Sequence, residues 1–284
     1  MKIKKKTLTQ SLNKTFRKEK INRGDFDTFV SELQLLLSKV DENESEEHLK
    51  YPLRDFLLRT TIAGNEIYTK GRTDLAIYSG ATNQSKVNVI FEVKKPNSKD
   101  FPGLEHINSK ALHETILYYL RERTGENNDE IKQLILTNVY EWYIIDALDF
   151  EKCFYTNSLI DEYKKWEAGQ KTSKGTEHFY KIAAQYIANN AGDIPVTYFD
   201  LREFIKHKDD NESKLVPLFK VLSATHLLKL SYITDSNSLN TQFYNELLYI
   251  VGLQEVKEGT KKLIKRANRA QRNAGSLIEN TIST

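Results

Sequence analysis

The sequence predicts an α/β fold, with a central mixed sheet flanked by helices, followed by a mostly α-helical domain. Three observations support this prediction. Between residues 25 and 60, apolar residues recur every three or four positions, which is typical of amphipathic helices. Between residues 66 and 93 they fall in short β-rich runs separated by glycine, serine and asparagine. After residue 150 the strand patterns fade and helical spacing returns.

Composition restricts the class of protein. The chain has 284 residues, of which 39% are hydrophobic and 29% charged, enough for a real core. No run approaches the roughly 20 apolar residues of a membrane helix, and no hydrophobic segment follows the N-terminus as in a secretory signal. The single cysteine, Cys153, permits no internal disulfide and no cysteine-based zinc site. We therefore expect a cytoplasmic protein without a membrane segment.

Positive charge is concentrated at the two ends of the chain. Residues 1–20 contain eight Lys or Arg and one Glu, whereas residues 254–284 contain seven and three Glu. An anionic partner such as a nucleic acid would therefore contact the ends of the chain. Solvated helix faces and a tail explain the same charges equally well.

We expect three regions: a basic N-terminal arm over 1–24, an α/β domain over 25–150 and a helical domain over 151–284. The α/β domain begins with a helix from Asp25. A second helix follows Ser45, a plausible N-cap because acidic residues occupy the next turn. The expected strands are 66–70, 73–78 and 87–93, then, after a helix over 108–123, 132–138 and 142–146. The later expected helices are 159–166, 176–189, 199–206, 215–226 and 242–251, with a linker at 169–175.

Two adjacent predicted strands carry a group of charged residues. Glu92 and Lys94 share one face of their strand, since side chains alternate with a period of two, and Asp74 begins the preceding strand. Two neighbouring carboxylates repel each other unless a cation lies between them. Mg²⁺ prefers such oxygen ligands, activates water and neutralises charge on a leaving oxygen, while a lysine stabilises the transition state. The pattern therefore indicates phosphodiester hydrolysis.

These residues resemble the PD-(D/E)XK nuclease superfamily. The match consists of Asp74 and, 18 positions later, the element Glu92-Val93-Lys94. The superfamily often adds a Glu from the helix before the hairpin, for which Glu46 or Glu47 is the candidate. The resemblance implies a restriction-endonuclease-like core, with Asp74, Glu92, Lys94 and that helix Glu as catalytic residues. It implies Mg²⁺, with Mn²⁺ as a substitute, bound by Asp74, Glu92 and the Val93 carbonyl.

Further motifs narrow the resemblance. The strings GRTDL from residue 71, FEVKKPN from residue 91 and ALHE with YYLRE on the next helix look like the N-terminal nuclease of type IIG restriction-modification enzymes. That resemblance implies a type II site-specific deoxyribonuclease in bacterial defence, with double-stranded DNA as the partner. The candidate DNA contacts are Lys70, Arg72, Lys95, His113, Glu114, Tyr118, Lys261, Lys262, Lys265 and Arg266.

Type IIG enzymes also contain an adenine methyltransferase and a target-recognition region, which this sequence does not show. No two of its five prolines are adjacent, so the Asn-Pro-Pro-aromatic motif is missing, and no Gly-rich cofactor loop follows a strand. We therefore expect no S-adenosylmethionine site, and expect those regions elsewhere in a longer or split enzyme. Two alternatives remain open: a catalytically silent domain that binds DNA or protein, and a nuclease acting on RNA or damaged DNA.

Overall fold

The computed structural model forms two compact units, residues 1–230 (unit 1) and 231–284 (unit 2). It describes residues 1–60, 67–70, 73–78, 85–169, 175–190, 192–205, 212–230, 241–258, 261–268, 272 and 275–282. Within these residues, no helix is both long and apolar enough to cross a membrane.

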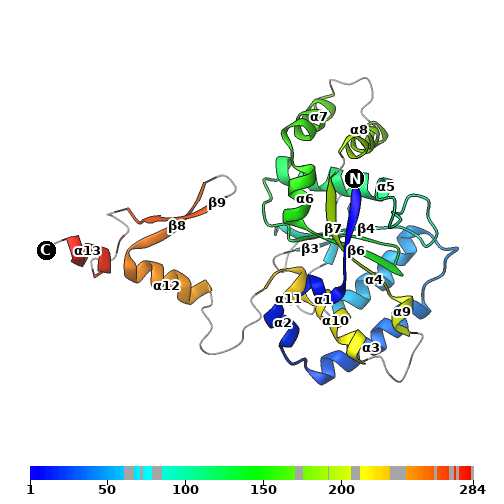
Figure 1. Ribbon diagram of the computed structural model, residues 1–284, viewed down its shortest axis with the longest axis horizontal. Coiled ribbons are helices and arrows are strands. Elements are labelled where there is room, and N and C mark those ends of the chain that lie inside the picture. Colours follow the sequence, from blue (N-terminus) through cyan, green and yellow to red (C-terminus); the bar gives the residue numbers. More distant parts are fainter. Residues whose placement is uncertain are drawn as a thin grey trace. The chain divides into compact units, whose positions relative to one another are not determined.

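A seven-stranded mixed sheet forms the centre of unit 1 (Figure 1). Its strand order is β1-β7-β6-β5-β4-β3-β2, in which the pairs β1–β7 and β4–β5 are parallel and the others antiparallel. The strands are β1 (Lys2–Lys6), β2 (Ile67–Lys70), β3 (Thr73–Tyr78), β4 (Val87–Val93), β5 (Gln133–Thr137), β6 (Glu141–Asp146) and β7 (Asp193–Asp200).

Helices cover both faces of this sheet (Figure 1). One layer contains α5 (Lys110–Leu120), which continues as a π-helical turn (Arg121–Gly125), α6 (Ala147–Phe154), α7 (Asn157–Glu167) and α8 (Thr176–Asn189). The other layer contains α1 (Leu8–Ser11), α2 (Lys14–Lys18), α3 (Arg23–Ser38), α4 (Glu46–Thr60), α9 (Arg202–Ile205), α10 (Glu212–Leu222) and α11 (Ala224–Leu227).

Aromatic residues fill the space between the sheet and each helix layer. Beneath α5 and α6, Tyr119 and Phe150 pack edge to face with ring centroids 5.0 Å apart. On the opposite face Phe29 of α3 contacts Phe56 of α4 at 5.7 Å and Phe219 of α10 at 5.3 Å. Strand β4 runs between these two cores, and all seven of its residues are buried. Glu92 therefore lies on a fully buried strand.

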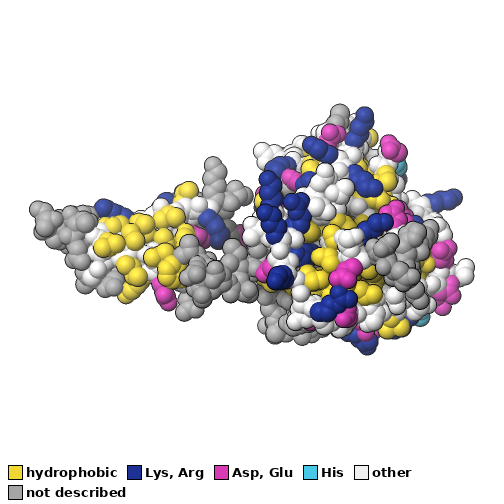
Figure 2. All heavy atoms as spheres, turned by 60° about the horizontal axis from the view of Figure 1, so that its bottom comes forward, with side chains coloured by type: hydrophobic (Ala, Val, Ile, Leu, Met, Phe, Trp, Pro, Cys, Tyr) yellow, Lys and Arg dark blue, Asp and Glu magenta, His cyan; other side chains and the backbone are white. Residues whose placement is uncertain are grey.

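Unit 2 is a small α+β element. It consists of α12 (Thr241–Val251), the antiparallel hairpin β8 (Leu253–Glu258) and β9 (Lys261–Arg266), and α13 (Leu277–Ile282). Figure 2 shows hydrophobic side chains exposed on one of its faces. Among its described residues, the exposed large apolar ones are Phe243, Leu247, Tyr249, Ile250, Ile264 and Leu277.

The structure confirms most of the elements expected before residue 150. Helices α3 and α4, the three strands β2, β3 and β4, and the pair β5–β6 all form where the sequence predicted them. Ser45 caps α4, because its hydroxyl accepts a hydrogen bond from the backbone N–H of His48. The general prediction of a mixed sheet flanked by helices is therefore correct.

The predicted domain boundaries differ from the structure. The boundary near residue 150 falls inside unit 1, because β7 completes the sheet that the first 150 residues begin. The expected N-terminal arm over 1–24 instead contains β1, which pairs with β7, and the short helices α1 and α2. Of the helix expected over 199–206, only the short α9 over 202–205 forms, because residues 199 and 200 end strand β7. Residues 261–266 form strand β9. The region after residue 150 is therefore not purely helical.

Candidate active site

The strand register brings the two predicted acids together. Leu75 of β3 pairs with Phe91 of β4 in antiparallel register, so Asp74 stands opposite Glu92 one position further along. Directly opposed side chains share a face of the sheet and have Cβ atoms about 5 Å apart. The Asp74 carboxylate also accepts a hydrogen bond from the backbone N–H of Val93 at 2.8 Å. This bond fixes the carboxylate beside the end of β4.

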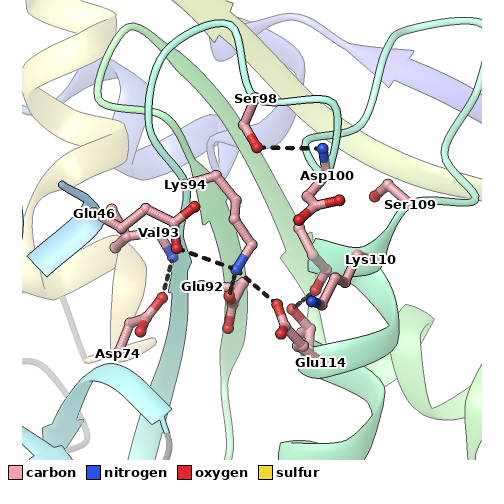
Figure 3. Close-up of polar contacts among 12 residues, drawn as sticks. Glu46, Asp74, Glu92, Val93, Lys94, Ser98, Asp100, Ser109, Lys110 and Glu114 are labelled. Carbon is pink, nitrogen blue, oxygen red and sulfur yellow. Dashed lines mark hydrogen bonds and ion pairs between the residues drawn. The ribbon is translucent and has the colours of Figure 1, made fainter. Parts of the chain in front are cut away.

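The Lys94 ammonium lies among three carboxylates (Figure 3). Its Nζ atom is 2.5 Å from Glu92 Oε1 and 3.7 Å from Glu46 Oε2. Glu114 Oε2, on α5, is 2.7 Å away, at ion-pair distance but outside hydrogen-bond geometry. The residues come from the first turn of α4, the end of β4 and α5. Elements from both helix layers therefore meet at one end of the sheet.

Burial strongly affects the charges in this cluster. Burial raises the pKa of Glu92 well above its ordinary value, and the nearby charges of Asp74 and Glu114 raise it further, against the opposing effect of Lys94. Burial lowers the pKa of Lys94, but the charges of Glu92 and Glu114 outweigh burial and raise it overall. Lys94 is therefore held as a cation. Glu92 Oε2 is buried and has no hydrogen-bond partner in the described part of the protein.

A second lysine, Lys50 of α4, contacts the other acid of the pair. Its Nζ atom lies 2.8 Å from Asp74 Oδ1 and 2.6 Å from Glu47 Oε2. Burial lowers the pKa of Lys50, yet its bonds to Asp74 and Glu47 outweigh this and raise it. Each of the two opposed acids thus has its own lysine. Lys50 is not among the predicted site residues; the signal for it in the sequence is its position four residues after Glu46, on the same side of a helix.

The comparisons with known proteins agree with the division into two units. The model of a family described as Domain of unknown function (DUF7149) matches residues 6–235. The chain belongs to this family. A second model, described as Domain of unknown function (DUF7814), matches residues 236–284. Searches of the curated proteins and of the solved structures found no match. The candidate site lies entirely within the DUF7149 domain.

The structure distinguishes between the two candidate glutamates on α4 of the DUF7149 domain. Glu46 reaches Lys94, whereas Glu47 is directed to Lys50 and its side chain is 62% exposed. Of these two glutamates, Glu46 is therefore the one that approaches the predicted catalytic lysine. The backbone N–H of Val93 is committed to Asp74, and a metal-binding role for its carbonyl remains a prediction.

Two of the predicted DNA contacts are buried inside the DUF7149 domain. Tyr118 is only 7% exposed, and burial raises its pKa, as do the nearby charges of Glu92 and Glu114. His113 is 9% exposed, and its Nε2 lies 2.6 Å from Asn108 Oδ1. Both side chains are therefore part of the packing beneath α5 and not of a DNA-binding surface. Glu114, predicted as a DNA contact, instead pairs with Lys94.

The other predicted DNA contacts fall into two groups. Lys95 is exposed beside the site, and Lys262, Lys265 and Arg266 are exposed on β9 of unit 2. The side chains of Lys70, Arg72 and Lys261 lie outside the described residues.

The predicted metal site is only partly formed in the arrangement of side chains. Among the described residues, no three His, Cys, Asp or Glu side chains are grouped so that they could hold a metal ion. Instead, the ammonium groups of Lys94 and Lys50 lie next to the carboxylates of Glu92 and Asp74. Two observations nevertheless fit a hard cation: the opposed carboxylates and the buried Glu92 oxygen without a partner. A cation at this position would compete with Lys94 and Lys50 for the oxygens of Glu92 and Asp74.

Proposed function

We propose that the DUF7149 domain is a Mg²⁺-dependent DNA endonuclease, related to the nuclease of type IIG restriction-modification enzymes and acting in bacterial defence. The observation that carries this proposal is the opposition of Asp74 and Glu92 on adjacent strands, with Lys94 in contact with Glu92. Methyltransferase and target-recognition regions would act with it, in a longer chain or as partner proteins. The sequence resemblance to PD-(D/E)XK nucleases supports the same assignment.

The donor groups suit a hard divalent cation. Asp74 and Glu92 offer carboxylate oxygens, and one Glu92 oxygen is buried without a partner. A carboxyl whose pKa is raised by burial and by neighbouring acids is stabilised in its ionised form when a cation binds beside it. When bound there, Mg²⁺ supplies a Lewis acid and a water of lowered pKa.

Lys94 is best suited to electrostatic stabilisation. Its raised pKa keeps the ammonium protonated at neutral pH, so it does not act as the base that deprotonates the attacking water. A fixed positive charge at this place would stabilise the negative charge that develops on the phosphoryl oxygens. Glu46, whose side chain is 37% exposed, is the carboxylate through which a water at the mouth of the site could be oriented.

One observation favours a second candidate function, a catalytically silent domain that binds DNA. Lys94 is surrounded by carboxylates and Asp74 is paired with Lys50, so both groups have partners without any substrate. A silent domain would retain this arrangement and bind DNA without hydrolysing it. Metal-dependent turnover separates the two functions.

A plasmid-cleavage assay tests the proposal. Supercoiled plasmid is incubated with the full chain in Mg²⁺, in Mn²⁺ and in EDTA. We expect nicked or linear product only with the metals, and a loss of about a hundredfold or more in Asp74→Asn, Glu92→Gln and Lys94→Ala. Lys39→Ala is the matched control, because Lys39 is an exposed lysine at the end of α3 that belongs neither to the site nor to the predicted DNA contacts. Circular dichroism checks that every variant is folded.

Two results would overturn the proposal. The first is cleavage by all three site variants at the rate of the parent protein. The second is DNA binding by the parent without turnover in any metal, which would establish the silent domain. A panel of duplex RNA and abasic or mismatched DNA in the same assay separates a DNA endonuclease from a nuclease that acts on RNA or damaged DNA.

A further inference from the structure

The N-terminal segment of unit 1 presents a concentrated positive surface. Residues 1–20 contain eight basic residues and one acidic residue. Seven of the eight side chains are exposed. We call these seven the N-terminal basic face: Lys2, Lys4, Lys5, Lys14, Arg17, Lys18 and Lys20.

These charges are not neutralised by neighbouring acids. Among the described residues, no member of the N-terminal basic face has a carboxylate at ion-pair distance, and only Lys6 of this segment reaches one, Asp149, at 3.6 Å. Cations elsewhere in unit 1 commonly have such partners, as Lys86 has in Asp129 and Lys152 in Asp149. A cluster of positive charges without acidic partners attracts an anionic ligand most strongly when that ligand carries many charges.

The segment is held firmly against unit 1. Strand β1 pairs with β7 over its whole length, and Leu12 and Phe16 are buried. The Lys220 ammonium, on α10, is buried and donates hydrogen bonds to the carbonyls of Phe16 at 2.8 Å and Arg17 at 3.0 Å. It also donates to the Glu19 carbonyl at 2.5 Å. The basic side chains therefore project from an ordered backbone, which lowers the entropic cost of binding.

Strand β1, which carries Lys2, Lys4 and Lys5 of this face, belongs to the same sheet as the candidate active site. Four strand-to-strand steps separate β1 from β4, which corresponds to about 19 Å. Following the register from Glu92 through Leu136 and Tyr143 leads to Tyr198 of β7, beside the end of β1. Lys5 Nζ lies 4.4 Å from the centre of that tyrosine ring. A separation of about 19 Å is about six base pairs of duplex DNA, so one duplex could span both places.

We propose that the N-terminal basic face binds the phosphate backbone of duplex DNA, on the same duplex that enters the Asp74–Glu92 site. This inference rests on the proposed function for the nature of the substrate. Six of the seven residues are lysines, which act as flexible point charges and not as bidentate readers of base edges. The contact is therefore independent of sequence and positions the DNA.

The exposed side chains argue against a membrane surface as the partner. Helices that bind lipid surfaces insert apolar residues beside their basic ones. Residues 1–20 are all described, and none of the exposed large hydrophobic side chains belongs to them. Leu12 and Phe16 point into the protein. The N-terminal basic face therefore suits a polyanion such as DNA, which has no apolar interior into which side chains must insert.

The test measures DNA binding without cleavage. A fluorescently labelled 30-base-pair duplex is titrated in EDTA at several salt concentrations from 50 to 200 mM, and binding is followed by anisotropy. The test variant is Lys4→Ala/Lys14→Ala/Lys18→Ala. The control variant, Lys39→Ala/Lys164→Ala/Lys181→Ala, removes the same charge from exposed lysines elsewhere in unit 1. We expect the test variant to reduce the slope of log K against log salt by about 2 to 3 and to weaken binding at least about tenfold.

The outcomes are separable from those of the cleavage assay. Equal slopes for the test and control variants would overturn the inference, as would tighter binding of the parent to anionic vesicles than to DNA. Because the test variant retains the active-site residues, it should cleave with a raised KM and an unchanged kcat. If the parent protein cleaves DNA but both triple variants bind DNA equally well, the role of the N-terminal basic face is rejected and the proposed nuclease function is retained. Salt-dependent binding that the test variant loses, without any cleavage, would reject only the proposed function.

Discussion

Lys50 Nζ lies 2.8 Å from Asp74 Oδ1, so one of the two acids proposed to bind a metal is already paired with a cation on the neighbouring helix. The same ammonium also holds Glu47. Lys50 therefore competes with a divalent cation for Asp74, and the strength of this pair sets part of the metal affinity.

Replacing Lys50 should therefore tighten metal binding. In Lys50→Met the competing charge is removed while the aliphatic stem is largely preserved, and we expect Mn²⁺ to bind about tenfold more tightly, or ~1.4 kcal/mol. Electron paramagnetic resonance of free Mn²⁺ measures the affinity. Lys39→Met removes an exposed lysine at the end of α3 and serves as the control. Weaker binding in Lys50→Met would instead show that Lys50 orients Asp74 for the metal.

His113 should make stability depend on pH. Burial lowers the pKa of His113 to about 4 from its ordinary 6.5, although Glu114 acts in the opposite direction. Between these pH values the unfolded chain binds a proton that the folded protein does not, so stability falls as pH drops from 6.5 towards 4. The loss from this residue amounts to about 3 kcal/mol at most.

The variant His113→Gln should show a flatter pH dependence, measured by urea denaturation between pH 4 and pH 7. His48→Gln, a change at an exposed histidine, should leave the dependence of the parent intact. If both variants show the same pH dependence as the parent, His113 is not held neutral by its burial.

Lys220 should be needed to hold the N-terminal helices in place. Lys220→Met removes three hydrogen bonds from a charged donor to the backbone carbonyls at and after the end of α2. We expect a loss of roughly 2 kcal/mol in stability and faster tryptic cleavage within residues 14–20. Lys214→Met, on the exposed side of the same helix, is the control. Unchanged cleavage in Lys220→Met would mean that β1 and the buried Phe16 hold the segment without it.

Gly252 should be essential for the packing of unit 2. It follows α12 with a φ of 90°, and a Cβ atom there would lie 2.9 Å from Ser276 Oγ. A side chain at such a φ costs about 1–2 kcal/mol before any overlap with the serine is counted. Gly252→Ala should therefore speed hydrogen exchange of the β8 and β9 amides by about fivefold or more. Gly192→Ala, where a Cβ meets nothing within 4 Å, should leave that exchange unchanged.

Local patterns were sufficient to predict the centre of the site. The period of two in a strand places Glu92 and Lys94 on one face, and the pairing of consecutive strands brings Asp74 beside them. The choice between Glu46 and Glu47 could not be made in this way, because a helix turns by about 100° per residue and its rotation depends on tertiary packing. Lys50 was missed for the same reason: its contact with Asp74 depends on how α4 lies against the sheet.

The edge of the sheet was not predictable from local patterns. Strand β1 reads KIKKK, which carries little apolar signal, and β7 contains Pro195, a residue that argues against a strand. Each becomes a strand by pairing with the other and, for β7, with β6. Their separation in sequence hides this pairing, and the domain boundary was consequently placed too early.

The pairing of β1 with β7 also affects how the nascent chain folds. Roughly 190 residues separate the two partners, so β1 leaves the ribosome long before its template has been translated. Throughout that interval its lysines repel one another and any second copy of the strand, which discourages aggregation between neighbouring polypeptides on a polysome. Strand β1 is thus synthesised well before β7 but can reach its final place only after β7 has been made.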